Sequence, residues 1–600
     1  MTAAERSNIT RYFEVNNARN QTRDEVVSSF VPPPAFRRLL SPKNHVILGS
    51  RGSGKTALTK MVSHSHLSMF TSKIAQEVIE TKRFIGLYVP SRLSWLGSQI
   101  DRLSSQKESL EQFVWKLNLA TAFALLDAVE SCLRVYITDP SKRVSREADL
   151  CHEISSQWNL SSGTILSLAD IRALLTKLDY EKKGALTAFR LGLADATSTY
   201  AIGLMFHNEL FDPLRRAISA VEEALDLNAS TTWLVCLDEI EFLEEDHHRL
   251  LNSHMRADSG NMYLKCTTLP YRHYTLETTT EVPIVEKHDF EYVYLDRERT
   301  DHIHLDLIPV FFSQIYDRRM RASGWSKTER KTLNYLLGSS DLLDEKAYNW
   351  SEDSIEMRLL QSFANTHTIA RAKRLLARDH TKRHFKDQIG RKIAPALILR
   401  HAVGAMGGRE ESGIYSGAAM VSRCADANPR MFIHLLNRML FETISGISYS
   451  NADQTLKPVP KHVQNRILLE YSRSELEKLR SEENGSLLYN MISSLGTYMH
   501  GLLHDRPLGT DNISSFTWEF GTDQTLDKAI RSAVGIGCVF PSINPKNPDR
   551  LPDFKGTFHI GFKFAPTFQI LPRKGKSIPL ESILNTDDKE ERQLGLFLRG

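Results

Sequence analysis

The chain has 600 residues, with 76 Lys and Arg against 72 Asp and Glu, which leaves a formal net charge of +4. Apolar residues make up 41% and charged residues 25%, values typical of soluble globular proteins. This composition excludes a largely disordered chain and a histone-like polycation. At about 100–200 residues per domain, the length predicts three or four domains.

The cysteines and the N-terminus indicate the compartment. None of the six cysteines forms a CxxC pair, which argues against zinc modules and a dense disulfide framework. The N-terminus is polar, and no stretch approaches 18 uninterrupted apolar residues, so neither a signal peptide nor a membrane span is predicted. We expect a protein of the reducing cytoplasm that does not contact membranes.

The strongest motif follows the first predicted strand, residues 45–48. It reads GSRGSGKT, and a helix-forming stretch comes directly after it. This is the GxxxxGK[ST] pattern of a phosphate-binding loop in its strand–loop–helix context. Lys55 is expected to reach the β- and γ-phosphates, and the Thr56 hydroxyl to ligate Mg²⁺. The predicted nucleotide contacts are Gly49, Ser50, Arg51, Gly52, Ser53, Gly54, Lys55 and Thr56. The alternative is a Gly/Ser-rich turn that matches by chance.

An acidic pair ends a second apolar run, residues 233–237. Such a run is typical of a parallel strand buried on both faces. Asp238 is expected to hold Mg²⁺ through water, and Glu239 to orient and deprotonate the attacking water. The alternative is an acidic helix start whose carboxylates only favour the helix dipole.

GTPases and ABC-type ATPases each carry a further motif, and this sequence lacks both motifs. An NKxD-like base reader of GTPases belongs downstream of the acidic strand, but the only similar segment, residues 176–179, precedes it. Residues 160–163 match the signature of ABC-type ATPases poorly. These absences favour ATP as the nucleotide.

Together these motifs resemble the ORC/Cdc6-like clade of AAA+ ATPases. Residues 30–47 are similar to its entry segment, which helps to surround the adenine, and residues 84–90, 262–268 and 290–295 fit its second, fourth and fifth strands. The resemblance implies an α/β P-loop NTPase (AAA+) core with a sensor-1 residue near the γ-phosphate. Thr267 and Thr268 are the candidates, and a threonine placed for β propensity is the alternative for each.

Two arginines are assigned by the same resemblance. Residues 427–433 are similar to the GNPR-type sensor 2, in which a lid helix delivers an arginine to the nucleotide, here Arg430. Ala427 stands where the family usually has glycine. Arg272 is the only arginine between Leu269 and Asp289 and is the candidate arginine finger offered to a neighbouring subunit. A purely structural arginine is the alternative at both positions.

The chain departs from a minimal core by a long insertion. The 142 residues from Ser91 to Thr232 separate the second strand from the acidic strand, and their apolar spacing predicts helices. Subunit or partner contact is the expected role. The predicted domains are an entry segment (1–40), a core (41–310) with the helical insertion (91–232), an α-helical lid (311–460) and a C-terminal winged-helix-like domain (461–600).

Basic residues gather in two places. Residues 366–392 hold nine Lys or Arg against two Asp in a helix-like stretch. After a polar break, a helix at 523–534 and strands at 538–540 and 557–564 resemble a winged helix. A solvated helix face and a protein-contact module are the alternatives. The candidate nucleic-acid contacts are Arg374, Arg378, Lys382, Lys528, Arg531, Arg573 and Lys574.

The expected function is that of a slow ATPase acting as a molecular switch. ATP and Mg²⁺ bind between core and lid, and the nucleotide state controls assembly with the protein itself, an effector protein or double-stranded DNA. The resemblance implies a role in bacterial antiphage defence. One alternative is a signalling scaffold that binds nucleotide structurally and docks an effector without DNA. A second is a replication-type DNA loading factor.

Overall fold

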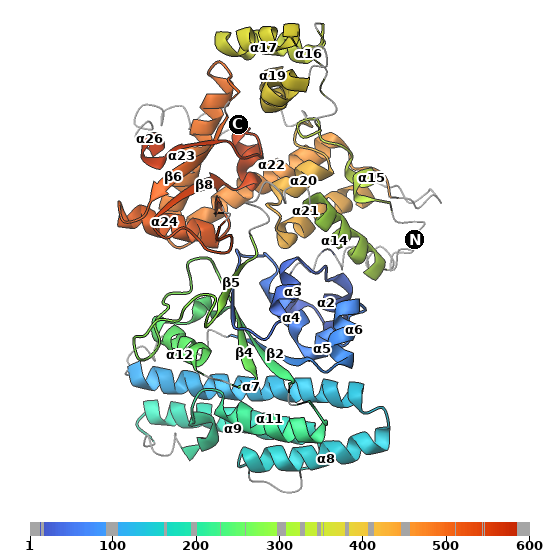
Figure 1. Ribbon diagram of the computed structural model, residues 1–600, viewed down its shortest axis with the longest axis vertical. Coiled ribbons are helices and arrows are strands. Elements are labelled where there is room, and N and C mark those ends of the chain that lie inside the picture. Colours follow the sequence, from blue (N-terminus) through green and yellow to red (C-terminus); the bar gives the residue numbers. More distant parts are fainter. Residues whose placement is uncertain are drawn as a thin grey trace. The chain divides into compact units, whose positions relative to one another are not determined.

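A computed structural model of the chain divides into two compact units (Figure 1). The sheet unit comprises Gln21–Leu48 and Lys55–Val293, and the downstream unit comprises Met1–Asn20, Gly49–Gly54 and Tyr294–Gly600. The structure describes residues 13, 17–91, 106–160, 165–193, 201–228, 230–257, 260–296, 308–323, 331–344, 348, 350–351, 353–378, 383–405, 413–445, 456–510, 512–542, 544 and 546–584.

A five-stranded sheet forms the centre of the sheet unit. Its order is β2-β3-β4-β1-β5, and the pairs β2–β3, β3–β4 and β4–β1 are parallel. The strands are β1 (His45–Leu48), β2 (Phe84–Pro90), β3 (Thr232–Asp238), β4 (Met262–Thr268) and β5 (Glu291–Tyr294). Strands β1 and β3 are almost wholly buried, as expected for strands covered on both faces. The predicted strands are confirmed to within one or two residues.

Short helices precede and follow β1 and accompany the sheet. They are α2 (Arg23–Ser29), α3 (Ala35–Leu39), α4 (Lys55–Val62), α5 (His64–Leu67), α6 (Lys73–Glu80) and α12 (Glu245–Arg256). Helix α4 packs on β2, β3 and β4. A Cβ atom on Gly86 of β2 would lie 2.0 Å from the Val62 carbonyl oxygen, so the end of α4 rests directly on the sheet.

The insertion is helical, as predicted. Its main helices are α7 (Gln106–Tyr136), α8 (Pro140–Gln157), α9 (Leu168–Arg190) and α11 (Asp212–Ala224). Helix α7 packs against β2. Helices α8, α9 and α11 all pack on α7, and α9 and α11 also pack on α8 (Figure 1). The buried Asn118 of α7 accepts the N–H of Phe211 at 2.7 Å and donates to the Phe206 carbonyl at 3.2 Å. This amide therefore fixes the loop that leads into α11.

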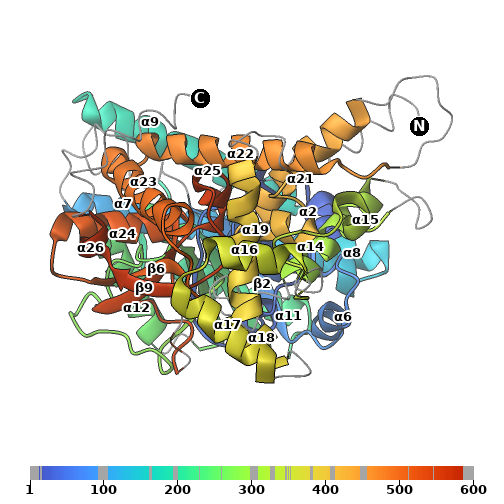
Figure 2. The ribbon, with the colours of Figure 1, turned by 90° about the horizontal axis from the view of Figure 1, so that it is seen from above.

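In the downstream unit, the elements found among the described residues from 308 to 478 are helices. The α-helices are α14 (Ile308–Ala322), α15 (Leu333–Leu337), α16 (Ile355–Phe363), α17 (Thr366–Arg378), α18 (Arg383–Phe385), α19 (Arg391–Ala405), α20 (Ala418–Cys424), α21 (Pro429–Ser445) and α22 (Lys461–Lys478). The predicted basic helical segment thus consists of α17, α18, a π-helical turn (Lys386–Gly390) and the start of α19. Figure 2 shows α22 lying between α21 and the C-terminal elements, and α22 packs on both α20 and α21.

The C-terminal elements form a second, smaller sheet. They are α23 (Gly485–His504), β6 (Ile513–Glu519), α24 (Gln524–Gly535), β7 (Val539–Pro541), β8 (Lys555–Ile560), α25 (Ala565–Phe568), β9 (Lys576–Pro579) and α26 (Leu580–Leu584). The sheet order is β7-β8-β6-β9. Strand β6 lies within the stretch that we interpreted from the sequence as a polar break. It buries Phe516 and Trp518 on alternate positions, a period of two that a search for helical spacing misses.

The six cysteines are free and buried. Burial raises the pKa of the Cys236 thiol to about 12 and that of Cys538 to about 11, so both thiols stay protonated and unreactive. Among the described residues, no helix has the length and apolar content needed to cross a membrane.

Candidate functional site

The carboxyl ends of β3 and β4 bring Asp238 and Thr267 together. The register pairs Leu237 with Cys266, so the next residues on the two strands are neighbours. The Thr267 hydroxyl donates to Asp238 Oδ1 at 2.6 Å, and the Tyr88 hydroxyl donates to Asp238 Oδ2 at 3.1 Å. Asp238 and Thr267 are fully buried. Residues from both neighbouring strands thus fix the orientation of the carboxylate.

Glu239 is held by the same threonine. Its backbone N–H donates to Thr267 Oγ1 at 2.8 Å, and its φ of 63° is left-handed. That conformation is uncommon for a residue other than glycine and is typical of functional sites, where the surrounding structure enforces it. The Thr268 hydroxyl, by contrast, donates to the Arg272 carbonyl at 3.2 Å. Of the two sensor-1 candidates, Thr267 is therefore the one bonded to both members of the acidic pair.

Arg272 lies in the loop between β4 and β5. Its guanidinium donates to the Tyr274 hydroxyl at 3.0 Å and lies 5.9 Å from the centre of that ring. The arginine is half-buried, and Tyr274 is exposed. This packing supplies a structural reason for an arginine here, and its role toward a neighbouring subunit stays a prediction.

Lys55 and Thr56 form the first turn of α4. Lys55 is buried and Thr56 is half-buried. The first N–H groups of a helix have no partner inside the helix, and the helix dipole makes that end positive. This turn therefore offers the N–H groups, the ammonium and the hydroxyl that a phosphate with its cation requires.

In the downstream unit, the loop Gly49–Gly54 is anchored by a carboxylate. The Ser50 N–H donates to Asp296 Oδ2 at 2.7 Å, and the Ser53 N–H donates to the Ser50 carbonyl at 3.1 Å. Ser50 and Asp296 are fully buried. Gly52 and Gly54 have φ of 84° and 99°, a conformation that favours glycine. Sequence reasoning missed Asp296, because an aspartate after a strand carries no motif.

The predicted sensor-2 motif contacts this loop. Asn428 Nδ2 donates to the Arg51 carbonyl at 2.8 Å, although the two residues lie 377 positions apart in the chain. A Cβ atom on Gly52 would lie 2.7 Å from Asn428 Oδ1 and 2.9 Å from Arg430 Cβ. The start of α21 can approach the loop this closely only because residue 52 has no side chain.

Three arginines gather beside the loop. The pKa of Arg430 lies below its usual range, through partial burial first and then through the positive charges of Arg19 and Arg51. Arg51 forms an ion pair of 2.7 Å with Glu482. Mutual repulsion among guanidinium groups favours a bound anion, and their planar heads suit phosphate. No sequence signal pointed to Arg19, which lies in a short turn (Ala18–Asn20) far from any motif.

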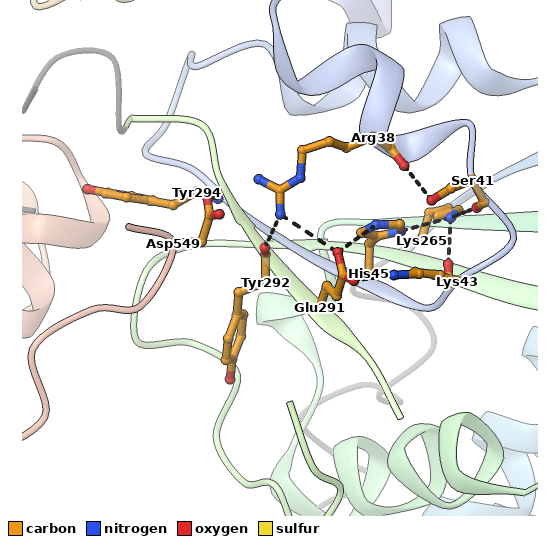
Figure 3. Close-up of polar contacts among 9 residues, drawn as sticks. All are labelled: Arg38, Ser41, Lys43, His45, Lys265, Glu291, Tyr292, Tyr294 and Asp549. Atoms are coloured by element: carbon orange, nitrogen blue, oxygen red, sulfur yellow. Dashed lines mark hydrogen bonds and ion pairs between the residues drawn. The ribbon is translucent and has the colours of Figure 1, made fainter. Parts of the chain in front are cut away.

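A buried lysine pins the turn that leads into β1 (Figure 3). The Lys265 ammonium donates to the carbonyls of Ser41 and Lys43 at 2.7 and 2.5 Å and to His45 Nδ1 at 2.8 Å, which satisfies its three N–H groups. Burial lowers the pKa of Lys265 to about 7. Burial and the Lys265 charge lower the pKa of His45 to about 2. A lysine within a strand carries no sequence signal for this role.

Beside it, Arg38 of α3 donates to the Tyr292 carbonyl of β5 at 3.0 Å and lies 3.9 Å from the Glu291 carboxylate (Figure 3). Lys43 pairs with the same carboxylate at 2.6 Å. The entry segment is therefore attached to β4 and β5, the two neighbours of β1.

Four of the candidate nucleic-acid contacts are exposed on two helices. Arg374 and Arg378 lie on α17, and Lys528 and Arg531 lie on α24. On α24 the buried side includes Ala529, Ile530 and Ala533, which leaves Lys528 and Arg531 on the exposed side of the helix. Lys382 lies outside the described residues.

The remaining candidates are half-buried. Arg573 donates to the carbonyls of Arg391 and Lys392 at the start of α19, and Lys574 follows it in the chain. The two basic segments recognised in the sequence therefore meet at this point. Because its guanidinium N–H groups are engaged by these carbonyls, the observed contacts of Arg573 are structural.

Comparison with known proteins gives one family. The model of the ORC-CDC6-like family matches residues 11–580, nearly the whole chain. No curated protein matches the sequence significantly. The family implies an AAA+ ATPase, which agrees with a phosphate-loop motif before α4 and an acidic pair at the end of β3. The chain belongs to the ORC-CDC6-like family.

Proposed function

We propose that this protein binds and slowly hydrolyses ATP and that its nucleotide state controls assembly. The observation that carries the proposal is the 2.8 Å hydrogen bond from Asn428 to the Arg51 carbonyl. Through it the sensor-2 motif contacts the loop predicted to hold phosphates. A nucleotide that reshapes this loop acts directly on the helical part of the same unit.

Each catalytic role follows from the chemistry of its residue. The loop Gly49–Gly54 with Lys55 binds the phosphates through N–H groups and an ammonium. Glu239 accepts a proton from the attacking water, the bond from the γ-phosphorus to the bridging oxygen breaks, and ADP and phosphate leave. Arg430 stabilises charge on the transferring phosphoryl group.

The acidic pair fits a magnesium ion. Asp238 accepts one hydrogen bond on each carboxylate oxygen, and a carboxylate has about four acceptor sites, so two remain for metal-bound water. Thr56 supplies a hydroxyl at the start of α4. Mg²⁺ usually takes one or two protein ligands and completes its shell with water and substrate phosphate. It would neutralise phosphate charge in the transition state.

Two substitutions test the ATPase. Lys55→Ala is expected to abolish ATP binding, and Glu239→Gln to retain binding while phosphate release falls at least about a hundredfold. Lys73→Ala is the matched control, because Lys73 is exposed at the start of α6. Unchanged binding and hydrolysis in Lys55→Ala would refute the proposal.

Assembly is tested by mass. The purified protein should change its oligomeric mass between ATP, ADP and no nucleotide, and Glu239→Gln should trap the ATP-dependent form. A mass that is independent of nucleotide removes assembly from the proposal and leaves the ATPase intact.

Double-stranded DNA is the proposed partner of the basic elements. The exposed Arg374 and Arg378 lie one turn apart on α17, a spacing that suits a phosphate backbone. Gel shifts at two salt concentrations should show weaker binding at higher salt, and the double variant Arg374→Glu/Arg378→Glu should reduce the salt slope by about 2. The control is Lys142→Glu/Arg146→Glu on the exposed side of α8.

The absence of binding even at low salt favours a signalling scaffold instead. One observation supports that second candidate, since Tyr180 in α9 and Leu191 and Leu193 just after that helix are 78%, 68% and 77% exposed. The proposed setting is bacterial antiphage defence, which rests on the family resemblance. Phage plating on cells with wild type, Lys55→Ala or Glu239→Gln tests it, and equal plaque numbers on all three count against it.

A further inference from the structure

The turn between α20 and α21 has an unusual backbone. Asp426 and Ala427 have φ of 51° and 50°, so two successive residues other than glycine are left-handed. Such residues are strained and persist where the surroundings enforce them. Here the enforcing contacts come from two different parts of the downstream unit.

The first contact is made by the Asp426 carboxylate with the C-terminal elements. Oδ1 accepts the N–H of Phe562 at 2.7 Å, and Oδ2 accepts the N–H of Lys563 at 3.2 Å. Asp426 is 4% exposed. A buried carboxylate that accepts two backbone N–H groups is a strong anchor, because both bonds are charge-assisted.

The accepting turn is itself fixed. Lys563 is buried, and its ammonium lies 3.5 Å from Glu475 Oε2 on α22. Burial alone would raise the pKa of Glu475, but the Lys563 and Lys478 charges hold it below its usual range. The ion pair between Lys563 and Glu475 therefore holds in place the turn after β8, whose N–H groups donate to Asp426.

The second contact is made two residues later with the phosphate loop. Asn428 is 1% exposed and donates to the Arg51 carbonyl. The C-terminal elements also reach the loop directly, since a Cβ atom on Gly537 would lie 3.1 Å from the Ser50 Cβ. Asp426 and Asn428 thus connect the turn after β8 to the loop through one strained tripeptide.

We propose that Asp426 is a positioning residue that couples the turn at Phe562–Lys563 to the phosphate loop by holding Asn428 against it. Coupling between two sites is reciprocal, so a ligand on the loop tightens the C-terminal turn, and a ligand on the C-terminal elements tightens the loop. The coupling rests on the proposed function only in taking that loop ligand to be ATP.

Hydrogen exchange without nucleotide tests the coupling first. In Asp426→Asn, the loop amides of Ser50 and Ser53 should exchange about tenfold faster or more, the factor expected for losing a charge-assisted bond. Asparagine tolerates a left-handed backbone as aspartate does, so this variant weakens the anchor without adding backbone strain. A thermal melt checks that the variant is folded.

Asp527→Asn is the matched control. The Asp527 carboxylate also accepts two N–H groups in the C-terminal elements, from Trp518 and Gly521 at 2.8 Å each, and it belongs to α24 rather than to the turn that carries Asn428. It should leave loop exchange unchanged. Asn428→Ala should in turn speed exchange at Phe562 and Lys563. Loop exchange that is unchanged in Asp426→Asn, or equally fast in Asp527→Asn, would overturn the coupling.

An ATP experiment separates the two proposals. With wild type, ATP should slow exchange at Phe562 and Lys563, whereas Asp426→Asn should bind ATP and show no slowing. Slowing of equal size in the variant also overturns the coupling. A wild type that binds no ATP contradicts the proposed function, while the comparison made without nucleotide still decides the coupling.

Discussion

The hydroxyl of Thr267 donates a 2.6 Å hydrogen bond to Asp238 on the adjacent strand. The same oxygen accepts the Glu239 N–H at 2.8 Å, so one side chain of β4 orients two consecutive acidic residues, the last of β3 and the one that follows it. This bond exists because β3 and β4 are parallel and in register, which brings their carboxyl ends to one edge of the sheet.

We expect Thr267→Val to lower the rate of ATP hydrolysis at least about tenfold. The change leaves a buried carboxylate oxygen and the Glu239 N–H without their partner, at a cost of about 1–3 kcal/mol in the free energy of unfolding. Phosphate release and thermal melting measure the two effects.

Thr268→Val is the control for that substitution, because the Thr268 hydroxyl bonds only the Arg272 carbonyl among the contacts described above. Thr268→Val should retain most of the hydrolysis rate. Thr267→Ser, which keeps the hydroxyl, should restore the rate that is lost in Thr267→Val. Equal rates in Thr267→Val and wild type would show that the bond does not orient the acidic pair.

Gly86→Ala should destabilise the sheet unit by several kcal/mol. A Cβ atom would lie 2.0 Å from the Val62 carbonyl oxygen, and a backbone atom at the end of α4 cannot yield as a side chain can. Lys55 begins the same helix, so nucleotide affinity should fall as well. Gly184→Ala on α9, where a Cβ atom has open space, should be neutral or stabilise by up to about 1 kcal/mol. Urea unfolding of both variants measures these changes in the free energy of unfolding.

Ala427→Gly is expected to stabilise the protein. The φ of 50° at this position costs an alanine about 1 kcal/mol relative to glycine. The melting temperature should therefore rise. Ala418→Gly in the helical α20 is the opposite control and should lower it. A fall in both variants would contradict the strained turn.

Stability should fall as the pH drops below about 6.5. Burial lowers the pKa of His64 to about 4, of His254 to about 3 and of His273 to about 4. The unfolded chain binds protons at these groups near pH 6.5 while the folded chain does not. Their contribution to the free energy of unfolding is therefore fully present above pH 6.5 and is lost as the pH falls from 6.5 to about 3.

Urea titrations at pH 7.5, 6.5, 5.5 and 4.5 measure this loss. His64→Gln should reduce the pH slope by about 1.4 kcal/mol per pH unit, the value for one proton. Stability that is constant from pH 7.5 to 4.5 would show that these histidines do not titrate on unfolding.

Local sequence patterns account for the separate elements of this protein. The loop motif, the acidic pair, the five strands and the helical insertion all follow from patterns of a few adjacent residues, because glycine spacing and apolar periodicity act over one strand or one turn. The near-neutral total of +4 conceals basic segments that the same local inspection reveals.

Which distant residues meet is seen in the folded structure alone. It distinguished Thr267 from Thr268 through strand register, and it joined Asn428 to Arg51 across 377 positions. It also revealed anchors that carry no motif, namely Asp296, Lys265 and Asp426. These are buried polar groups whose hydrogen-bond partners come from other elements. A local pattern cannot specify such partners, because packing chooses them and the chain connects them only over long separations.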